Sequence, residues 1–195
     1  MRLASLRLAR SFGDVYSRRV QSSNFFLIRL TVLLGLAFVA VSGRAQDLGA
    51  TVSEPGAFSY QAPRGWSVKE TPVSRYKVSV DKLKNHFSAH ISVVMQVYPG
   101  TLAAYVDVNK RAFAASPAFK NFQIVEEKQF TTTAGGIGVR LVATATVQHL
   151  DLQQIFYFFE GTGDNKLVVT ASSLVGDSAA YAPIFDASLK TFSPK

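Results

Sequence analysis

Cysteine does not occur in this chain of 195 residues, which excludes disulfide bonds, thiol chemistry and a lipid-modified cysteine. Tryptophan occurs once, methionine twice and histidine three times. Histidine, a common metal ligand and the usual side chain for acid–base chemistry near neutral pH, is therefore limited to three positions. Charged residues make up only 17% of the chain, whereas 48% of it is hydrophobic. A chain of this composition must stabilise its fold by packing rather than by covalent cross-links.

One long apolar run without a charge extends over Leu30–Val41, after an arginine-rich stretch. A basic region, an apolar core of about a dozen residues and small residues before the cleavage point define a secretory signal peptide. Gly43 and Ala45 fit the −3 and −1 positions, so we predict that residues 1–45 are a signal peptide cleaved between Ala45 and Gln46. The alternative is a retained membrane anchor. Spanning a bilayer takes about 20 apolar residues, and this run is shorter.

The formal net charge of +8 comes mostly from this N-terminal segment. Residues 1–45 hold seven of the 21 basic residues and one of the 13 acidic residues, which leaves 14 and 12 in residues 46–195. Only Lys77, Lys82 and Lys84 are grouped, as is typical of a solvated loop or edge. A domain that binds nucleic acid needs a basic face, so we do not expect nucleic acid as a partner.

The remaining 150 residues are enough for one domain without disulfides. Residues 46–56 are small and polar and predict a flexible lead-in, followed by a folded domain over residues 57–195. An exported protein without cysteine is ordinary in a bacterial envelope, whereas small eukaryotic secreted domains often use disulfides. We therefore expect a periplasmic or secreted bacterial protein with no stable membrane span after cleavage.

Alternating apolar and polar residues predict several strands and one helix in the first half of the domain. Phe58–Ala62 and Trp66–Lys69 flank a Pro-Arg-Gly turn and are expected to pair as a hairpin, with Trp66 as a core residue. Ile91–Tyr98 is the next predicted strand. A helix is predicted over Leu102–Ala115, with Thr101 as its N-cap.

The second half predicts a β-meander followed by a helix. Four strand-like runs are separated by short turns: Phe122–Thr132, Ile137–Gln148, Ile155–Glu160 and Lys166–Ser173. Turns this short require antiparallel neighbours. Ile155–Phe159 is apolar at every position, which favours a central strand covered on both faces. A terminal helix is expected over Ala182–Phe192, with Pro183 in its first turn.

These elements predict an α+β fold, in which a central antiparallel sheet of about six to seven strands lies between helices in α/β/α layers. Two segments also resemble a known family. Phe58–Trp66 (FSYQAPRGW) is similar to the strand, proline turn and tryptophan that open PsbP-like domains, and Tyr181–Phe192 (YAPIFDASLKTF) resembles the helix that closes them. Between them, the strand Ile91–Tyr98 and the late strand Lys166–Ala171 follow the same order.

The resemblance to the PsbP-like domain family, the PsbP/Mog fold, covers nearly all of residues 57–195. It implies a central antiparallel sheet between helices. The superfamily includes the photosystem II extrinsic subunit, small nuclear-transport accessory proteins and many bacterial envelope proteins of unknown role. Such relatives mostly bind other proteins, and they share no active-site motif, so the resemblance implies no catalytic residue in this chain.

The three histidines are the first candidates for chemistry. His86 and His90 would share one face if residues 81–90 were helical, and Asp81 could then add an oxygen ligand to a metal ion. The segment leads directly into a predicted strand, however, which makes a helix there doubtful. His149 precedes Leu150 and Asp151 between two predicted strands, and the simplest interpretation is a turn histidine.

Other motifs give no active site. No serine has the flanking glycines of a nucleophile elbow, so a grouping of Ser92, His149 and Asp151 has no sequence support. Gly161-Thr162-Gly163 joins two strands and predicts a turn rather than a dinucleotide loop. Glu126 and Glu127 are neighbours on a strand and must point to opposite faces. We predict no catalytic, metal-binding or cofactor-binding residue, and no cofactor.

Aromatic residues are the remaining signal. Thirteen of them are spread over the predicted strands and helices: Phe58, Tyr60, Trp66, Tyr98, Tyr105, Phe113, Phe119, Phe122, Phe130, Phe156, Tyr157, Phe158 and Phe159. Most are expected in the core, but so many rings could also line a cleft.

These observations predict an exported, non-catalytic protein-binding or complex-assembly accessory domain, with a partner protein in the cell envelope. This interpretation requires an exposed apolar patch. The alternative is a carrier or sensor of a small apolar ligand in an aromatic-lined pocket of about 300 Å³ or more. A metal protein or enzyme centred on His86 and His90 is a third possibility. The sequence leaves the oligomeric state open.

Overall fold

A computed structural model describes residues 48–69 and 78–195. The predicted signal peptide 1–45, its cleavage between Ala45 and Gln46, and Lys77 lie outside the described residues. The described elements, in chain order, are β1 (Leu48–Glu54), β2 (Phe58–Pro63), β3 (Ser67–Lys69), β4 (Val78–Val80), β5 (His90–Val97), α2 (Leu102–Ala114), β6 (Lys120–Thr131), β7 (Ile137–Val147), β8 (Leu150–Glu160), β9 (Asn165–Leu174), the 3₁₀ turn η2 (Val175–Asp177), α3 (Ser178–Lys190) and β10 (Ser193–Pro194).

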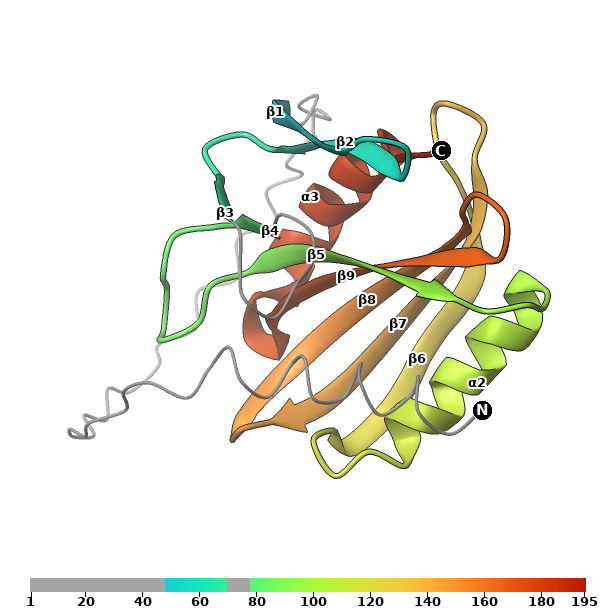
Figure 1. Ribbon diagram of the computed structural model, residues 1–195. Coiled ribbons are helices and arrows are strands. Elements are labelled where there is room, and N and C mark those ends of the chain that lie inside the picture. The colour runs from blue at the N-terminus through green and yellow to red at the C-terminus, as the bar shows by residue number, and fades with distance from the viewer. Residues whose placement is uncertain (1–47, 70–77) are drawn as a thin grey trace, which may run out of the picture.

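The larger of two sheets has seven strands in the order β3-β4-β5-β9-β8-β7-β6, and every neighbouring pair is antiparallel (Figure 1). Strands β6 to β9 follow one another through short turns, as the meander prediction required. The α+β fold with an antiparallel sheet is therefore confirmed. Strand β8 begins at Leu150, five residues before the apolar run that predicted it, because Leu150–Gln154 continue the pairing with β7.

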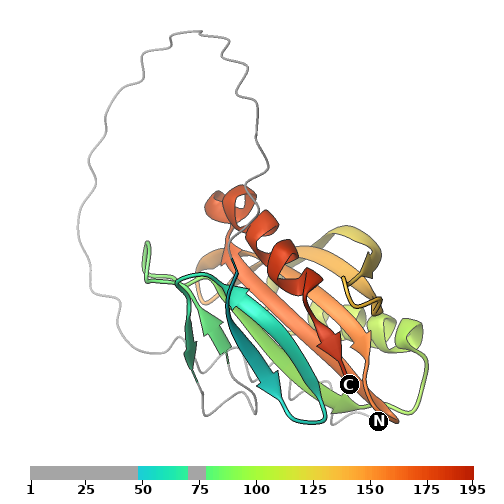
Figure 2. The ribbon, with the colours of Figure 1, turned by 90° about the horizontal axis from the view of Figure 1, so that it is seen from above.

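Different elements pack on the two faces of this sheet. Helix α2 packs on one face, and α3 packs on the other together with a small sheet of order β1-β2-β10 (Figure 2). Alternate residues of β5, β7, β8 and β9 therefore belong to two separate hydrophobic clusters. The expected α/β/α layering is found in part, because α3 shares its layer with the small sheet.

Strand β8 lies between β9 and β7, inside the sheet. Its residues Ile155–Phe159 are all 1% exposed or less, so the prediction of a central strand covered on both faces is confirmed. Phe156 stacks on Phe113 of α2, with ring centroids 4.6 Å apart. On the other face, the ring of Phe159 stacks on Phe192 at 4.8 Å. The aromatic residues of β8 thus pack against α2 on one face of the sheet and against Phe192, which follows α3, on the other.

Helix α2 begins where the sequence predicted. The hydroxyl of Thr101 accepts a hydrogen bond from the backbone N–H of Ala104 at 3.2 Å, which satisfies one of the free donors of the first turn. Helix α3 differs from the prediction, because it begins at Ser178 rather than Ala182. Pro183 therefore lies inside the helix and not in its first turn, and the helix lacks the backbone hydrogen bond that residue 183 would otherwise donate.

Two predictions for the start of the domain are wrong. Residues 48–54, expected within the flexible lead-in 46–56, form strand β1, because their backbone pairs with β2 from Leu48 opposite Pro63 to Glu54 opposite Phe58. The expected hairpin between Phe58–Ala62 and Trp66–Lys69 does not form. Instead β2 pairs with β1 and β10, and β3 pairs with β4.

Candidate functional site

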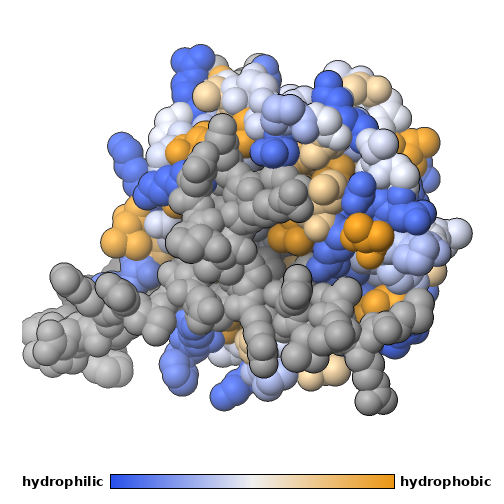
Figure 3. Space-filling model, viewed as in Figure 1, coloured by the Kyte–Doolittle hydropathy of each residue, from blue (hydrophilic) through white to orange (hydrophobic). Residues whose placement is uncertain are grey.

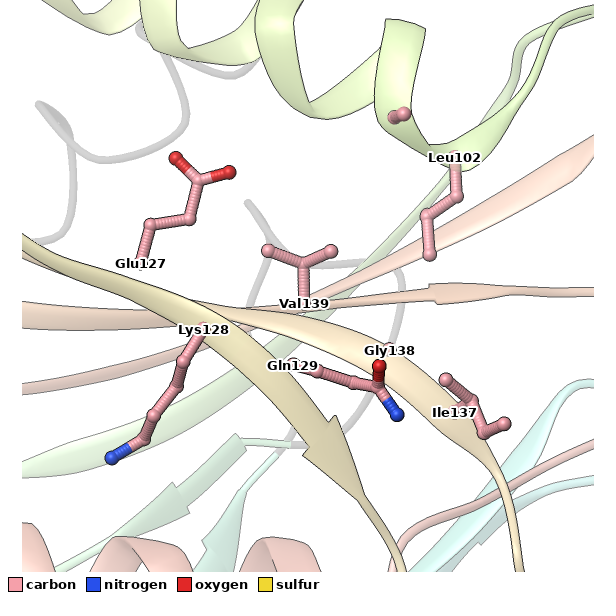
Figure 4. Close-up of a pocket in the computed structure, with 8 residues that line it drawn as sticks. Leu102, Glu127, Lys128, Gln129, Ile137, Gly138 and Val139 are labelled. Carbon is pink, nitrogen blue, oxygen red and sulfur yellow. The ribbon is translucent and has the colours of Figure 1, made fainter.

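An open groove of about 490 Å³ lies between the start of α2 and strands β6 and β7. Helix α2 contributes Leu102 and Ala103, and the strands contribute Glu127, Lys128, Gln129, Ile137, Gly138 and Val139. Figure 4 shows Leu102 extending from α2 towards the strands, while Val139 and Glu127 extend towards the helix and Lys128 points away. We call this feature the α2–β7 groove.

Apolar side chains form much of the groove. Ile137 is 63% exposed at the start of β7, and Val139 follows on the same face of the strand. Gly138 lies between them, and a Cβ there would come within 2.3 Å of the carbonyl oxygen of Phe158. The glycine therefore allows β7 and β8 to approach closely beneath the groove.

Glu127, which lines the groove, belongs to an ion-pair network with α2. Lys110 of α2 lies 2.8 Å from Glu127 of β6 and 3.2 Å from Asp107 of its own helix. The hydrogen bond with Glu127 is the main cause that raises the pKa of Lys110. These contacts neutralise the Glu127 carboxylate and hold α2 against the sheet, so the groove presents a mainly apolar surface.

The groove borders an edge of the large sheet. Strand β6 is the last strand in the sheet order, and it runs for 12 residues. Its pairing with β7 is irregular between Lys120 and Gln123 and between Ile124 and Glu126, and bulges of this kind protect edge strands from pairing with other chains. The stretch from Glu126 to Thr131 pairs with β7 without interruption. The regular part of the edge thus lies beside the groove.

Exposed apolar side chains are distributed over several elements. Among the described residues, the large ones are Val68, Leu83, Val97, Ile124, Val125, Ile137 and Val175. On the coloured part of the face in Figure 3, apolar residues are separated by hydrophilic ones. Of the seven, Ile137 borders the groove. The apolar surface expected for partner binding is thus best represented at the α2–β7 groove.

The structure separates the residues of the proposed metal site. Lys84 and Phe87 exchange two backbone hydrogen bonds of 2.9 Å around Asn85 and His86, so this segment is a tight hairpin and not a helix. His90 starts strand β5, and Asp81 accepts a hydrogen bond from Tyr181 at 2.6 Å. The helix over residues 81–90 that would have placed His86 and His90 on one face does not form. Among the described residues, no three His, Asp or Glu side chains lie close enough together to hold a metal ion.

Other motifs behave as the sequence suggested. His149 lies in the two-residue turn between β7 and β8, and Gly161–Gly163 lies in the turn between β8 and β9. Glu126 pairs with Arg140, whereas Glu127 pairs with Lys110 of α2, which confirms that the two carboxylates point to opposite faces. Lys82 and Lys84 are exposed in a loop, as a solvated group should be.

The aromatic residues belong to the core rather than to the groove. No aromatic side chain is among the residues that line the α2–β7 groove, and most of the rings are buried in contact with one another. Trp66 is partly buried and packs against α3, with its ring centroid 6.0 Å from Phe185 and 6.3 Å from Tyr181. The described structure therefore gives no support to an aromatic-lined ligand pocket.

Sequence reasoning missed a buried charge network on the α3 side. Arg140 of β7 is 5% exposed, and its guanidinium contacts Asp186 at 2.9 Å and Glu126 at 3.1 Å. The hydroxyl of Tyr157 also donates to Asp186. Burial is the main cause that raises the pKa of Tyr157 well above its ordinary value. A charged residue at an inward position of a strand was the one available signal.

The fold defines the class of protein. This chain has an α+β fold with an antiparallel sheet and two helices, and solved structures of the PsbP/Mog1 fold match it. The cyanobacterial PsbP of Synechocystis, CyanoP, is 14% identical, with a TM-score of 0.57 over 82% of this chain and 99% of its own. LpqN of Mycobacterium tuberculosis, described as involved in cell envelope biogenesis, is 13% identical, with a TM-score of 0.57 over 74% and 88%.

A third match is the Ran-binding protein Mog1p of Saccharomyces cerevisiae, at 11% identity and a TM-score of 0.51 over 75% of this chain and 96% of its own. At such identities the likeness establishes the fold alone. No family model and no curated protein matches the sequence. Within residues 48–69 and 78–195, no helix combines the length and the apolar character needed to cross a bilayer.

Proposed function

We propose that this chain is an exported, non-catalytic accessory protein that binds a partner protein in the cell envelope through the α2–β7 groove and the adjacent edge of β6. The signal peptide predicted for residues 1–45 would direct export, and residues 46–195 would act outside the cytoplasm.

The main support for this proposal is the position of the apolar α2–β7 groove beside the regularly paired part of the edge strand β6. Strand β6 is the last strand of the sheet among the described residues, so an extended segment of a partner can add to its outer edge by main-chain hydrogen bonds, and alternate side chains of that segment then point towards the groove. Ile137 and Leu102 would contact an apolar side chain of the partner. Because Glu127 is already paired with Lys110, the segment need not carry a matching charge there.

The comparisons support the binding role and the location as proposals. Mog1p is described as a protein that binds Ran, and LpqN as a protein of cell envelope biogenesis. The partner of this chain is a separate question, because the fold alone does not carry a partner from one protein to another.

Site-specific photo-crosslinking in the native cell tests the proposed surface. A photoreactive side chain at Ile137 should give a defined crosslinked protein product, and the same side chain at Leu83, which is 72% exposed, is the matched control. The further substitution Val139→Asp should remove the product at Ile137. Equal products at both positions, or a product that survives Val139→Asp, would exclude the groove.

Export is tested separately by fractionation and N-terminal sequencing of the mature protein. We expect the protein outside the cytoplasm with Gln46 as its first residue. A precursor that remains intact in the cytoplasm contradicts the proposed export, whatever the crosslinking result.

A further inference from the structure

Strand β6 carries charged side chains on the face that is opposite the α2–β7 groove. Glu127 points towards α2, where it pairs with that helix, so its neighbours Glu126 and Lys128 belong to the α3 side of the sheet. Lys190, the last residue of α3, lies on this side as well. Its ammonium is 4.7 Å from the ring centroid of Phe130, which belongs to the α3-side core. Two lysines from distant parts of the chain thus flank the same stretch of β6.

The position of Lys190 is fixed by two hydrogen bonds at the end of β6. The backbone N–H of Thr133 donates to the carbonyl oxygen of Lys190 at 2.7 Å. The ammonium of Lys190 donates to the carbonyl oxygen of Thr131 at 2.6 Å. These bonds hold the end of α3 against the turn between β6 and β7, so the last side chain of the helix reaches the edge strand.

The carbonyl group that Lys190 contacts points away from the sheet. The N–H of Thr132 donates to the carbonyl oxygen of Gly136 across the turn at 2.8 Å, so the backbone groups of residue 132 point towards β7. In an antiparallel ladder these directions alternate along the strand, so the backbone groups of Thr131 and, further back, of Glu127 point towards the outer edge. The Lys190 ammonium therefore lies at one end of the row of groups that a partner strand would use.

The charges on the α3 side of this edge do not balance. Lys128 lies 2.6 Å from Glu126 Oε1, but the same oxygen also lies 3.1 Å from Arg140, whose other partner is Asp186. Within residues 48–69 and 78–195, no carboxylate forms an ion pair with Lys190. Three cations therefore share two carboxylates, which leaves an excess of one positive charge. The side chain of Lys128 is 55% exposed and Lys190 is exposed, so a partner can reach both lysines.

We propose that the partner segment that binds the edge of β6 is acidic, with apolar side chains towards the α2–β7 groove and carboxylates towards Lys128 and Lys190. This inference rests on the function proposed above and specifies the chemistry of the partner. Successive side chains of a strand point to opposite faces, so a segment beside β6 presents one set to the groove and the other set to the two lysines. A basic segment would meet like charges there, which is unfavourable.

Fluorescence polarisation with short labelled peptides tests this chemistry on the purified protein. The probes are peptides of alternating valine and glutamate, valine and glutamine, and valine and lysine. We expect the glutamate peptide to bind most tightly, and its binding to weaken when the salt concentration is raised from ~0.05 M to ~0.5 M, because salt screens exposed charges. Absence of binding by the glutamate peptide, or equal binding by the lysine peptide, overturns the proposal.

Charge-removing variants test the two lysines. Lys128→Gln and Lys190→Gln should each weaken binding of the glutamate peptide about threefold, as the loss of a partly exposed ion pair does. Lys190→Arg retains the charge and should bind normally, which separates a loss of charge from a change in the turn. Lys82→Gln, at an exposed position in the loop between β4 and β5, is the matched control and should also bind normally. Unchanged binding by the double variant at Lys128 and Lys190 overturns the proposal.

Crosslinking at Ile137 in the native cell separates the groove from the charge preference. The crosslinked product should decrease in the double variant at Lys128 and Lys190. A product that is equally strong in this variant would retain the groove and overturn the acidic partner. Loss of the glutamate peptide in Val139→Asp is the expected sign that the peptide uses the groove. Peptide binding that Val139→Asp leaves unchanged, together with no product at Ile137, would overturn the groove itself and this inference with it.

Discussion

Arg140 Nε lies 2.9 Å from Asp186 Oδ1 and joins the middle of β7 to α3. The arginine side chain is almost fully buried, and Asp186 also accepts a hydrogen bond from Tyr157. A buried guanidinium without its carboxylate is an uncompensated charge. The pair therefore fixes the position of α3 on the sheet.

Asp186→Asn should lower the free energy of unfolding by about 2 kcal/mol, less than a fully buried pair because Asp186 is 37% exposed and Glu126 still contacts Arg140. Urea denaturation measures the change. The control is Asp177→Asn, which breaks the more exposed pair with Lys84 and should cost about 0.5 kcal/mol or less. Equal losses in the two variants would mean that the Arg140 network does not hold α3.

His90 should make stability depend on pH. Its folded-state pKa is lowered by burial, so below about pH 6.5 the unfolded chain takes up a proton that the folded chain does not. The stability present above pH 6.5 is therefore lost as the pH falls towards the folded-state pKa, by up to about 1.4 kcal/mol per pH unit.

Denaturation curves measured between pH 7.5 and pH 5, a range around the ordinary histidine pKa of about 6.5, test this dependence in His90→Gln. The variant should show a flatter pH profile. His86→Asn and His149→Asn are matched controls, because both histidines lie in exposed turns with positive φ angles of 62° and 70°, which asparagine tolerates. A profile that flattens in the controls but not in His90→Gln would contradict the assignment.

Gly138→Ala should be strongly destabilising. The added Cβ would lie 2.3 Å from the backbone oxygen of Phe158 and 2.6 Å from the ring of Phe159, so β7 and β8 must separate. We expect a loss of about 3 kcal/mol in thermal or chemical unfolding. Gly176→Ala is the control, because no atom lies within 4 Å of the position that its added Cβ would take and its φ is not positive, and it should be neutral.

Trp66→Ala should lower the free energy of unfolding by about 2 kcal/mol, since the ring is only partly buried against Phe185 and Tyr181. Circular dichroism measures the midpoint, because the variant retains no tryptophan for fluorescence. Val68→Thr, at a 37% exposed position of β3, should change the free energy by less than about 0.5 kcal/mol. An unchanged midpoint in Trp66→Ala would mean that the ring does not anchor α3.

The sequence predicted the strands and helices that are specified by residues close to one another in the chain. The apolar run Ile155–Phe159 indicated a central strand, and the short turns around it required antiparallel neighbours, both of which the structure contains. Thr101 marked the start of α2 because a cap acts within one turn. These signals depend on residues that are close in the chain.

Partner choice between distant segments was not predictable in the same way. Strand β2 has an ordinary alternating pattern, and nothing in it specifies pairing with β1 and β10 rather than with β3. The groove combines Leu102 with Ile137, and the charge network combines Arg140 with Asp186, only after the sheet and helices have packed. Both sites therefore required the three-dimensional structure.

The pairing of Ser193 with Ser59 and of Pro194 with Phe58 sets an order of events during synthesis. While a ribosome makes the chain, β2 emerges early and its neighbour β10 emerges only after the whole meander has been translated. Contacts between such distant segments form slowly because a long loop must close first. The nascent polypeptide consequently passes through a period in which the apolar residues of β2 lack their final cover, and chaperones have that interval in which to bind it.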